Sequence, residues 1–458
     1  MIRFSRELFE LLYGTDRSVL AAQLKRYNAL AELWHRRYGT GDKDADFASL
    51  RFFSSPGRSE IGGNHTDHNL GKVLAASIRQ DCIAAVRATD DNTVYVYDPG
   101  YNADYSINIG GSDDERAQAV QKGAACTDAD NQPREEKGSA ALIRGIVQGF
   151  KNAGYKTGGF KACFTSDVIA AAGVSSSAAF EMLICVILNN LFNGGKIPLT
   201  AFPAIGSFAE NRYWNKKSGM LDQTACVLGG LIAIDFKNPA QPLIEKIPFD
   251  FDKEAYALMI VNTGSGHADL SEAYSAIPAE MQAVARAVGK EHLRDTSFEE
   301  VYENLCRIRK TCGDRAVMRA FHFFEENKRV DKEVRALKTG DFTSFLNLIT
   351  ESGNSSWKWL QNICIADKPE SQPVAVCLAL TEHFIRIHNV GACRVHGGGF
   401  AGVIQAFIPR SLCGAYTSYM EKALGYDAGT GQKSPVFAMS IRPAGTVEIP
   451  MNPFFRRG

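Results

Sequence analysis

The chain has 458 residues, of which 45% are hydrophobic and 22% charged, as in ordinary globular proteins. That length exceeds what one ordinary hydrophobic core holds, so we expect two domains. Basic and acidic residues number 51 each and no block of lysine or arginine stands out, which gives no electrostatic support for binding to nucleic acid or to an anionic membrane.

Eleven cysteines are scattered along the chain, and none forms a CxxC pair. Scattered cysteines, odd in number, are typical of a protein in a reducing compartment, where cysteine serves as a small core residue. The first residues, MIRFSRELFELLYG, alternate charged with apolar side chains, unlike a secretory leader, and no segment has the apolar length of a membrane span. We therefore expect a cytoplasmic protein.

Apolar periodicity predicts helix over residues 5–38, with an interruption near Gly14. Residues 100–137 are polar and predict a long loop with short helices, and residues 281–346 are mostly helical. Strands are predicted where apolar or alternating runs end at turn residues: 72–78, 82–89, 93–98, 161–168, 229–236, 256–266, the two flanks of a glycine turn within 392–409, and 436–449. This mixture indicates an α/β or α+β class, with a linker near the prolines of residues 236–254.

The segment GNHTDHN (residues 63–69) places two histidines and one aspartate within four positions, in a chain with nine histidines. Such a group could bind a metal, transfer protons, hold a sugar or cap a turn. A local zinc pair usually occupies positions i and i+4 of one helix face, whereas the glycine and asparagine here predict a loop. The spacing therefore argues against a metal and leaves the other interpretations open.

The segment GVSSSAA (residues 173–179) directly precedes a long apolar helix. Small residues at a helix N-terminus leave backbone N–H groups and hydroxyls accessible to an anion at the positive end of the helix dipole. An ordinary N-cap accounts for one serine but not for three. The segment predicts a phosphate-binding loop, and the absence of a GK[ST] sequence excludes a P-loop NTPase.

A second glycine segment, HGGGFAG (residues 396–402), satisfies GxGxxG, but the β-rich VIQAFIP follows it instead of a helix. That context excludes a dinucleotide-binding turn, and a protein kinase is excluded because the chain has no HRD or DFG sequence. The remaining interpretation is that the glycines let the backbone come close, either to a ligand or to a second strand. Two carboxylates beside apolar segments, Glu210 and Asp222, are candidates for a base or a Mg²⁺ ligand, or for simple helix caps.

Taken together, these segments resemble the motifs of the galactokinase branch of the GHMP small-molecule kinases, in the same order. PGRSEIGGNHTDHNLGKVL is similar to the sugar-binding motif GRVNLIGEHTDYNGGxVL, and SDVIAAAGVSSSAAFE to the phosphate loop PxGxGLSSSAA. HGGGFAG resembles TGGGFGG, SGMLDQ resembles SGxMDQ, and VNTGSGHADLSEAY, with His267 and Tyr274, resembles NSNVKHxLxxSEY. The matches span residues 56–408, and five in the correct order are hard to obtain by chance.

The resemblance implies a two-domain α+β fold. Residues 1–240 would resemble the second domain of ribosomal protein S5, residues 241–458 would be ferredoxin-like, and the active site would lie in the cleft between them. The implied reaction is a kinase transfer in carbohydrate metabolism, in which ATP and an aldohexose, first of all galactose, give the α-sugar 1-phosphate and ADP without a phospho-enzyme. ATP and Mg²⁺ are the implied cofactors, and a monomer or weak homodimer is the implied state.

The resemblance also assigns roles to single residues. Arg58 matches an arginine beside the transferring phosphate, where a guanidinium offsets charge, and Asp222 matches the aspartate that accepts the sugar's proton or orients its hydroxyl. The ATP-binding positions are Gly173, Ser175, Ser176, Ser177 and Ala178, and the Mg²⁺ positions are Ser176, Ser177 and Glu210. The sugar positions are Asn64, His65, Asp67, Gly219 and Tyr274.

Departures from the family pattern bear mainly on the substrate. Asn64 replaces a glutamate near the C6 hydroxyl of the sugar, so a C6 carboxylate would be repelled less. The Asp67–His68 pair also resembles uronic-acid kinases of this branch, but no added cation accompanies it. We therefore expect galactose first and galacturonate or an N-acetylhexosamine second. The changes at Ala171, Leu221, His396 and Ala401 are not expected to disable the site.

Two alternatives come from other classes. One is a sensor that binds galactose and ATP without catalysis, against which the intact Arg58 and Asp222 argue, since a sensor has no need of both. The other is a different GHMP chemistry, such as phosphorylation of mevalonate or homoserine. The HTDH sequence argues against it, because that sequence is specific to the sugar branch.

Overall fold

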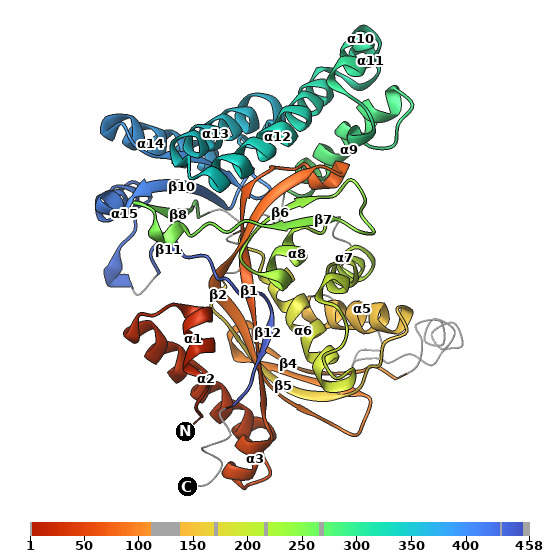
Figure 1. Cartoon of the computed structure of the whole chain (residues 1–458), viewed down its shortest axis with the longest axis vertical. Helices are drawn as coiled ribbons and strands as arrows, with labels where there is room; N and C mark the ends of the chain where they lie inside the picture. Colours follow the sequence, from red (N-terminus) through yellow and green to blue (C-terminus); the bar gives the residue numbers. More distant parts are fainter. Residues whose placement is uncertain are drawn as a thin grey trace.

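The computed structural model describes residues 2–110, 138–168, 173–214, 219–264, 270–430 and 433–451. These residues form two antiparallel-rich sheets, a large one and a small one, with helices packed on both (Figure 1). The fold is therefore mixed α+β, as the sequence predicts. Within the described ranges, no helix combines the length and the apolarity needed to cross a bilayer.

The large sheet has the strand order β12-β1-β2-β5-β3-β4, and β6 and β7 extend it from β2. All of its pairings are antiparallel except that of β3 with β5. Its strands are β1 (Arg51–Gly62), β2 (Lys72–Ala88), β3 (Thr93–Asp98), β4 (Ala103–Asn108), β5 (Phe160–Ser166), β6 (Leu231–Asp235), β7 (Leu243–Lys246) and β12 (Val447–Ile449). The last strand of the chain thus lies beside the first.

Helices cover both faces of the large sheet. On one face lie α1 (Arg6–Tyr13), α2 (Arg17–Tyr38) and α3 (Lys43–Ser49), and on the other α5 (Ser139–Asn152), α6 (Ser176–Phe192), α7 (Phe202–Tyr213) and α8 (Leu221–Leu228) (Figure 1). Helix α6 packs against β1 and β2 and also against α5, α7 and α8. A helix enclosed on all sides is apolar all round, which explains why α6 is mostly apolar and has Glu181 as its single charged residue.

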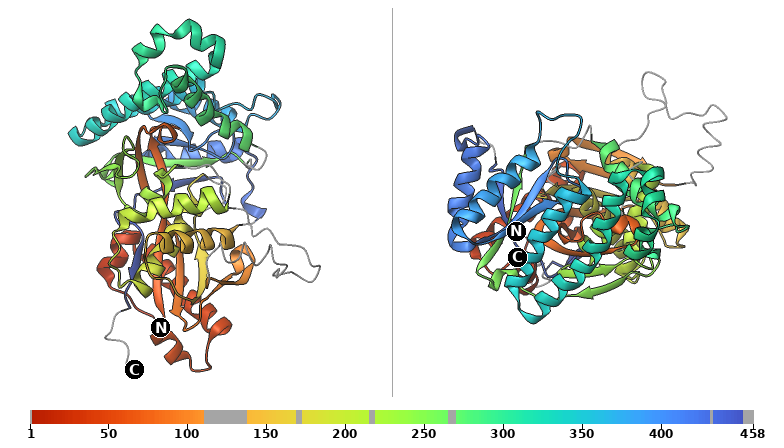
Figure 2. Two further views of the ribbon diagram at one scale, coloured as in Figure 1. Left: turned by 90° about the vertical axis from the view of Figure 1, so that its right-hand side faces the viewer. Right: turned by 90° about the horizontal axis from the view of Figure 1, so that it is seen from above.

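The small sheet has the order β11-β8-β10-β9 and is antiparallel throughout. Its strands are β8 (Tyr256–Asn262), β9 (Ala392–His396), β10 (Val403–Pro409) and β11 (Val436–Met439). The helices at this end are α9 (Ser271–Ala287), α10 (Phe298–Glu303), α11 (Leu305–Cys312), α12 (Asp314–Thr339), α13 (Phe342–Ser355), α14 (Pro373–His388) and α15 (Cys413–Ala423). Helices α10 to α14 form a layer at the end of the molecule opposite α3, whereas α15 packs beside the small sheet (Figure 1, Figure 2).

The long strand β2 corrects one sequence prediction. The sequence predicts two strands, 72–78 and 82–89, separated by the polar residues 79–81, whereas β2 runs unbroken from Lys72 to Ala88. Asp81 is fully buried, and it accepts hydrogen bonds from Tyr13 Oη at 2.6 Å and Arg26 Nη1 at 2.5 Å and pairs with Arg442 Nη1 at 3.1 Å. Because its charge is compensated by partners far away in the sequence, the strand continues through the interior.

Other predicted elements agree more closely. The alternating run 93–98 is β3, the break near Gly14 separates α1 from α2, and residues 281–346 are largely helical. The polar stretch 100–137 holds the strand β4, which the sequence did not predict, and its residues 111–137 lie outside the described ranges. Strands β7 and β12 come from beyond residue 240 and join the large sheet, so the division of the chain at 240 remains a prediction.

Candidate functional site

Arg58 and Asp222 face each other although 164 positions separate them. Arg58 lies on β1 at an irregularity of its pairing with β2, and Asp222 lies in the first turn of α8. The guanidinium donates a hydrogen bond from Nε to Asp222 Oδ1 at 2.7 Å, with 8% of the arginine side chain and 28% of the aspartate side chain exposed. The two groups therefore form one site, and the carboxylate is its more accessible half.

The triple-serine turn joins this pair. Ser175 has the left-handed backbone conformation, φ 60° and ψ 55°, immediately before α6 begins at Ser176. A non-glycine residue in that region is strained, and the turn is held by Ser175 Oγ, which donates to Asp222 Oδ2, and by Arg58, whose Nη1 donates to Gly173 O. Arg58 also donates its backbone N–H to Val174 O at 3.1 Å. A guanidinium, a carboxylate and a helix N-terminus thus converge at one point.

The predicted magnesium positions adjoin the start of α6. Ser177 Oγ donates to Glu210 Oε1 at 3.1 Å, and Gln223 Nε2 donates to both Glu210 Oε2 at 3.1 Å and Glu181 Oε2 at 2.9 Å. Glu210 is buried, while Ser176 and Ser177 are partly exposed. Within the described ranges, no group of three or more His, Cys, Asp or Glu side chains could hold a metal ion, so a cation here would depend on few protein oxygens together with a ligand.

The predicted sugar positions form a second cluster beside the first. Tyr274, at the start of α9, lies 5.1 Å from His65 between ring centroids, and its Oη is 3.4 Å from His68 Nε2. Gly219 stands against the carboxylate of Asp67, where a side chain would collide. Burial raises the pKa of Tyr274, and the charges of Asp67 and Asp222 add to the shift because both carboxylates lie near its phenol. The two clusters are therefore contiguous.

The hydrogen bonds of His65 define its tautomer. Its Nε2 lies 2.9 Å from Gly398 O, and a carbonyl oxygen only accepts, so Nε2 carries the proton. Nδ1 is then an acceptor, and it has no hydrogen-bond partner within the described part of the chain. Burial lowers the pKa of His65 to about 3, so the ring is neutral. A neutral ring with an unused lone pair suits a hydroxyl donor.

Burial of neutral His65 predicts a pH dependence of stability. Between pH 6.5 and the folded-state pKa of about 3, the unfolded chain binds a proton that the folded chain does not, so stability falls as the pH falls. The free energy of unfolding lost between pH 7 and 5.5 should be about 1 kcal/mol smaller in His65→Gln than in the parent. Urea unfolding of both proteins at the two pH values measures this difference, and equal losses would contradict a buried neutral His65.

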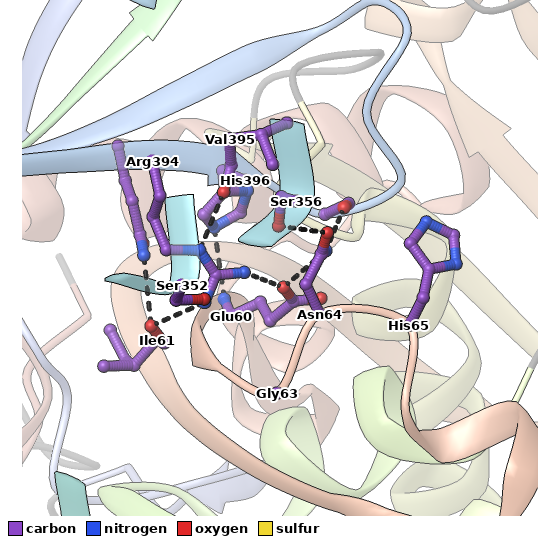
Figure 3. A network of polar contacts seen from close by, with 12 residues as sticks. Glu60, Ile61, Gly63, Asn64, His65, Ser352, Ser356, Arg394, Val395 and His396 are labelled. Carbon is purple, nitrogen blue, oxygen red and sulfur yellow. Dashed lines mark hydrogen bonds and ion pairs between the residues drawn. The ribbon is translucent and has the colours of Figure 1, made fainter. Parts of the chain in front are cut away.

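Asn64 is turned into the protein (Figure 3). Its side-chain nitrogen donates to Glu60 Oε1 at 2.9 Å and Gly397 O at 2.7 Å, and its oxygen accepts from Ser356 Oγ at 3.2 Å and Asn362 Nδ2 at 2.9 Å. These bonds use the full hydrogen-bonding capacity of the amide, and the residue is fully buried. Asn64 therefore links the sugar motif to the third glycine motif, and any bond to a sugar hydroxyl would have to replace one of these four.

Beneath Asn64 lies an ion pair that sequence analysis missed. Arg394 is fully buried; it donates to Glu60 from Nη2, to Ile61 O from Nη1 at 3.0 Å and to Val395 O from Nε at 2.9 Å (Figure 3). Burial raises the pKa of the Glu60 carboxyl, and the charge of Arg394 opposes that shift. The available sequence signal was Arg394 itself, a charged residue inside the short strand sequence ACRVH. The bonds from Arg394 to Glu60 and to Ile61 O join β9 to β1.

The departures noted in the sequence fall in different places. Ala401, Leu221 and His396 are buried. Ala171, His267 and Ser218 lie outside the described residues.

Comparisons with known proteins show which sequences and folds this chain is similar to. Residues 41–88 match the model of the galactokinase galactose-binding signature, and residues 141–230 match that of the GHMP kinases N-terminal domain. A galactokinase of Streptomyces coelicolor is 27% identical over 399 residues, which cover 86% of this chain and 92% of the relative.

Solved structures share the fold. The structure of Lactococcus lactis galactokinase complexed with galactose superposes with a TM-score of 0.72 at 23% identity, over 92% of this chain and 99% of that one. A mevalonate kinase of Methanococcus jannaschii is more distant, with a TM-score of 0.54 at 12% identity over 85% of this chain and 98% of that one.

Proposed function

Because the chain belongs to the galactokinase family of the GHMP kinase superfamily, and is therefore a galactokinase-like phosphotransferase, we propose that it phosphorylates the anomeric hydroxyl of galactose. The observation that carries the proposal is the meeting of Arg58, Asp222 and the Ser175 turn at one point. A phosphoryl transfer needs positioning and charge compensation more than covalent chemistry. This arrangement supplies both.

In the proposed reaction the anomeric oxygen attacks the γ-phosphorus of ATP. The new P–O bond forms in line with the breaking bond to the β–γ bridging oxygen, ADP leaves, and the hydroxyl proton passes to Asp222. Arg58, whose position is fixed by Asp222 and Gly173, offsets charge on the equatorial oxygens of the transferring group. No phospho-enzyme is required.

The start of α6 is the proposed site of the nucleotide phosphates. Its dipole and the hydroxyls of Ser175, Ser176 and Ser177 suit an anion, and Gly173 and Ala178 leave backbone N–H groups accessible. Mg²⁺ would neutralise phosphate charge, and a hard cation prefers oxygen ligands such as Ser177 Oγ and Glu210, which lie together. These oxygens fit the cation that kinase chemistry uses.

A neutral hexose suits the sugar cluster better than a uronic acid. Among the charges that act on Tyr274 and His65 are those of Arg58 and Arg319, respectively. Arg58 is bonded to Asp222, and Arg319 Nη1 is bonded to Glu280 at 2.9 Å. A C6 carboxylate would therefore meet cations that already have carboxylate partners, while Asp67 and Asp222 would repel it.

The direct test is an assay of ADP release with MgATP and a panel of galactose, galacturonate and N-acetylgalactosamine. We expect the highest kcat/KM for galactose and identification of the product as galactose 1-phosphate. Faster turnover of galacturonate would overturn the assignment of the substrate. Binding of galactose and ATP by calorimetry without ADP release would overturn the proposed reaction.

Asp67→Asn should raise the KM for galactose by about 10- to 100-fold, because the amide oxygen can replace only one of the two hydrogen bonds that the carboxylate would accept from hydroxyls, and a hydrogen bond to a charged group contributes about 1.5–3 kcal/mol. The KM for ATP should change little. Steady-state kinetics with each substrate varied in turn measures both constants. Asp331→Asn is the matched control, because Asp331 is exposed and bonded to Lys72 on the surface. Equal effects of the two variants would exclude the proposed contact.

A further inference from the structure

His396, the last residue of β9, is buried, with only 1% of the residue exposed. It stands at the first position of the third glycine motif, where the family pattern has threonine. Figure 3 shows it beside Glu60 and Arg394, at the junction of β1 with β9. The charges of Arg58 and Asp222 both act on it. It therefore lies within reach of the catalytic pair, yet the proposed reaction gives it no role.

The hydrogen bonds of His396 determine which nitrogen carries the proton. The backbone N–H of Glu60 donates to Nε2 at 3.1 Å, and Ser59 Oγ lies 3.0 Å from the same nitrogen. A backbone N–H only donates, so Nε2 is an acceptor and the proton of the neutral ring is on Nδ1. Burial lowers the pKa of His396 well below its usual value, which keeps the ring neutral. The tautomer is thus set by β1.

The proton on Nδ1 has no acceptor within the described part of the chain. A buried donor without a partner is costly, and native structures rarely keep one without a reason. Nδ1 faces Gly173, the first described residue of the phosphate loop: a Cβ placed on Gly173 would lie 3.7 Å from Nδ1 and 3.1 Å from Val403 Cγ2. A side chain at position 173 would therefore crowd Val403 and the unused donor, so the loop needs glycine here.

We propose that Nδ1–H of His396 donates a hydrogen bond to a phosphate oxygen of bound ATP, and that His396 is therefore a nucleotide-binding residue contributed by the small sheet. The inference rests on the proposed use of ATP at the start of α6. A phosphate oxygen is the acceptor that the reaction brings to this loop, and a fixed N–H in a water-excluded position binds such an oxygen strongly. Arg58 reaches the same loop from the large sheet. The two sheets would then hold the nucleotide between them.

A purely structural role for His396 would use Nε2 alone, through its bond from the Glu60 N–H. Two substitutions separate these roles. His396→Gln places an amide near the position of Nε2, where its oxygen can accept from Glu60, but removes the donor at Nδ1. His396→Asn places an amide nitrogen near the position of Nδ1 and loses the acceptor at Nε2.

The experiment is calorimetric titration of the parent and both variants with ATP and with AMP, without sugar, accompanied by thermal unfolding. We expect His396→Gln to weaken ATP binding by about tenfold or more and to leave AMP binding within about twofold, because only the phosphate chain loses a contact. His396→Asn should keep the preference of the parent for ATP over AMP even if its melting temperature falls. Galactose binding by both variants should match that of the parent.

Three outcomes would overturn the inference: unchanged ATP affinity in His396→Gln, an equal loss for ATP and AMP in that variant, or the loss of the ATP preference in His396→Asn. If His396→Gln does not fold, the ratio of ATP to AMP affinity in His396→Asn decides alone. A parent protein that binds no ATP would instead overturn the proposed function. The two failures are therefore distinguishable.

Discussion

Replacement of Asp222 by alanine should lower kcat by about 1,000-fold or more, since general-base assistance contributes about 10²- to 10⁴-fold and the loss also frees Arg58 and Ser175, both of which bond this carboxylate. Asp222→Asn should be nearly as inactive, because the amide keeps the shape but not the ability to take a proton. Galactose and ATP should still bind, as calorimetry would show. Release of ADP, followed with saturating substrates, measures the rate.

The control for Asp222 is Asp314→Asn. Asp314 also begins a helix and also pairs with an arginine, but 65% of its side chain is exposed and it lies on the surface at α12. The variant Asp314→Asn should leave kcat unchanged. Turnover by Asp222→Ala at the rate of the parent, with folding intact, would refute the role assigned to this aspartate.

Removal of the Arg394 side-chain charge should have the largest effect on stability. Arg394→Met should lower the free energy of unfolding by about 3–5 kcal/mol, which is typical when one partner of a buried ion pair is lost. Arg394 is bonded to Glu60, and its charge opposes the effect of burial on the pKa of Glu60, Glu326 and Glu333. Without it, three buried carboxyl groups lose a shared cation. Urea unfolding followed by circular dichroism measures the loss.

Two further variants test that explanation. Arg309→Met removes a cation from an exposed pair with Asp314 and should change stability by less than about 1 kcal/mol. Adding Glu60→Gln to Arg394→Met should recover part of the lost stability, because one uncompensated carboxylate disappears with it. If the double variant is as unstable as the sum of the two single ones, the carboxylate of Glu60 is not the source of the loss.

The buried layer around Arg394 explains how separated motifs reach one site. Asn64 bonds Gly397 O and His65 bonds Gly398 O, so the sugar motif holds the third glycine motif directly. The ring of Tyr274 packs against Gly398, where any side chain at position 398 would collide with it. A loss of stability at Arg394 should therefore be accompanied by weaker sugar binding in the fraction that remains folded.

The sequence alone determined the parts of the protein that local chemistry specifies. Alternation of side chains is enough to mark β3, because a half-buried strand has period two. Small residues before an apolar run are enough to mark the phosphate loop, because the first N–H groups of a helix are free. The order of five motifs was enough to predict the family, and with it the residues of the candidate site.

Only the tertiary structure decided which of these residues meet and where their side chains point. The pairing of Arg58 with Asp222, the inward turn of Asn64 and the unused donor of His396 each depend on contacts between distant segments. The same is true of β2, which stays unbroken because Arg26 and Arg442 compensate Asp81. A hydrogen-bond partner several hundred residues away leaves no periodicity in the sequence, so only the folded chain reveals it.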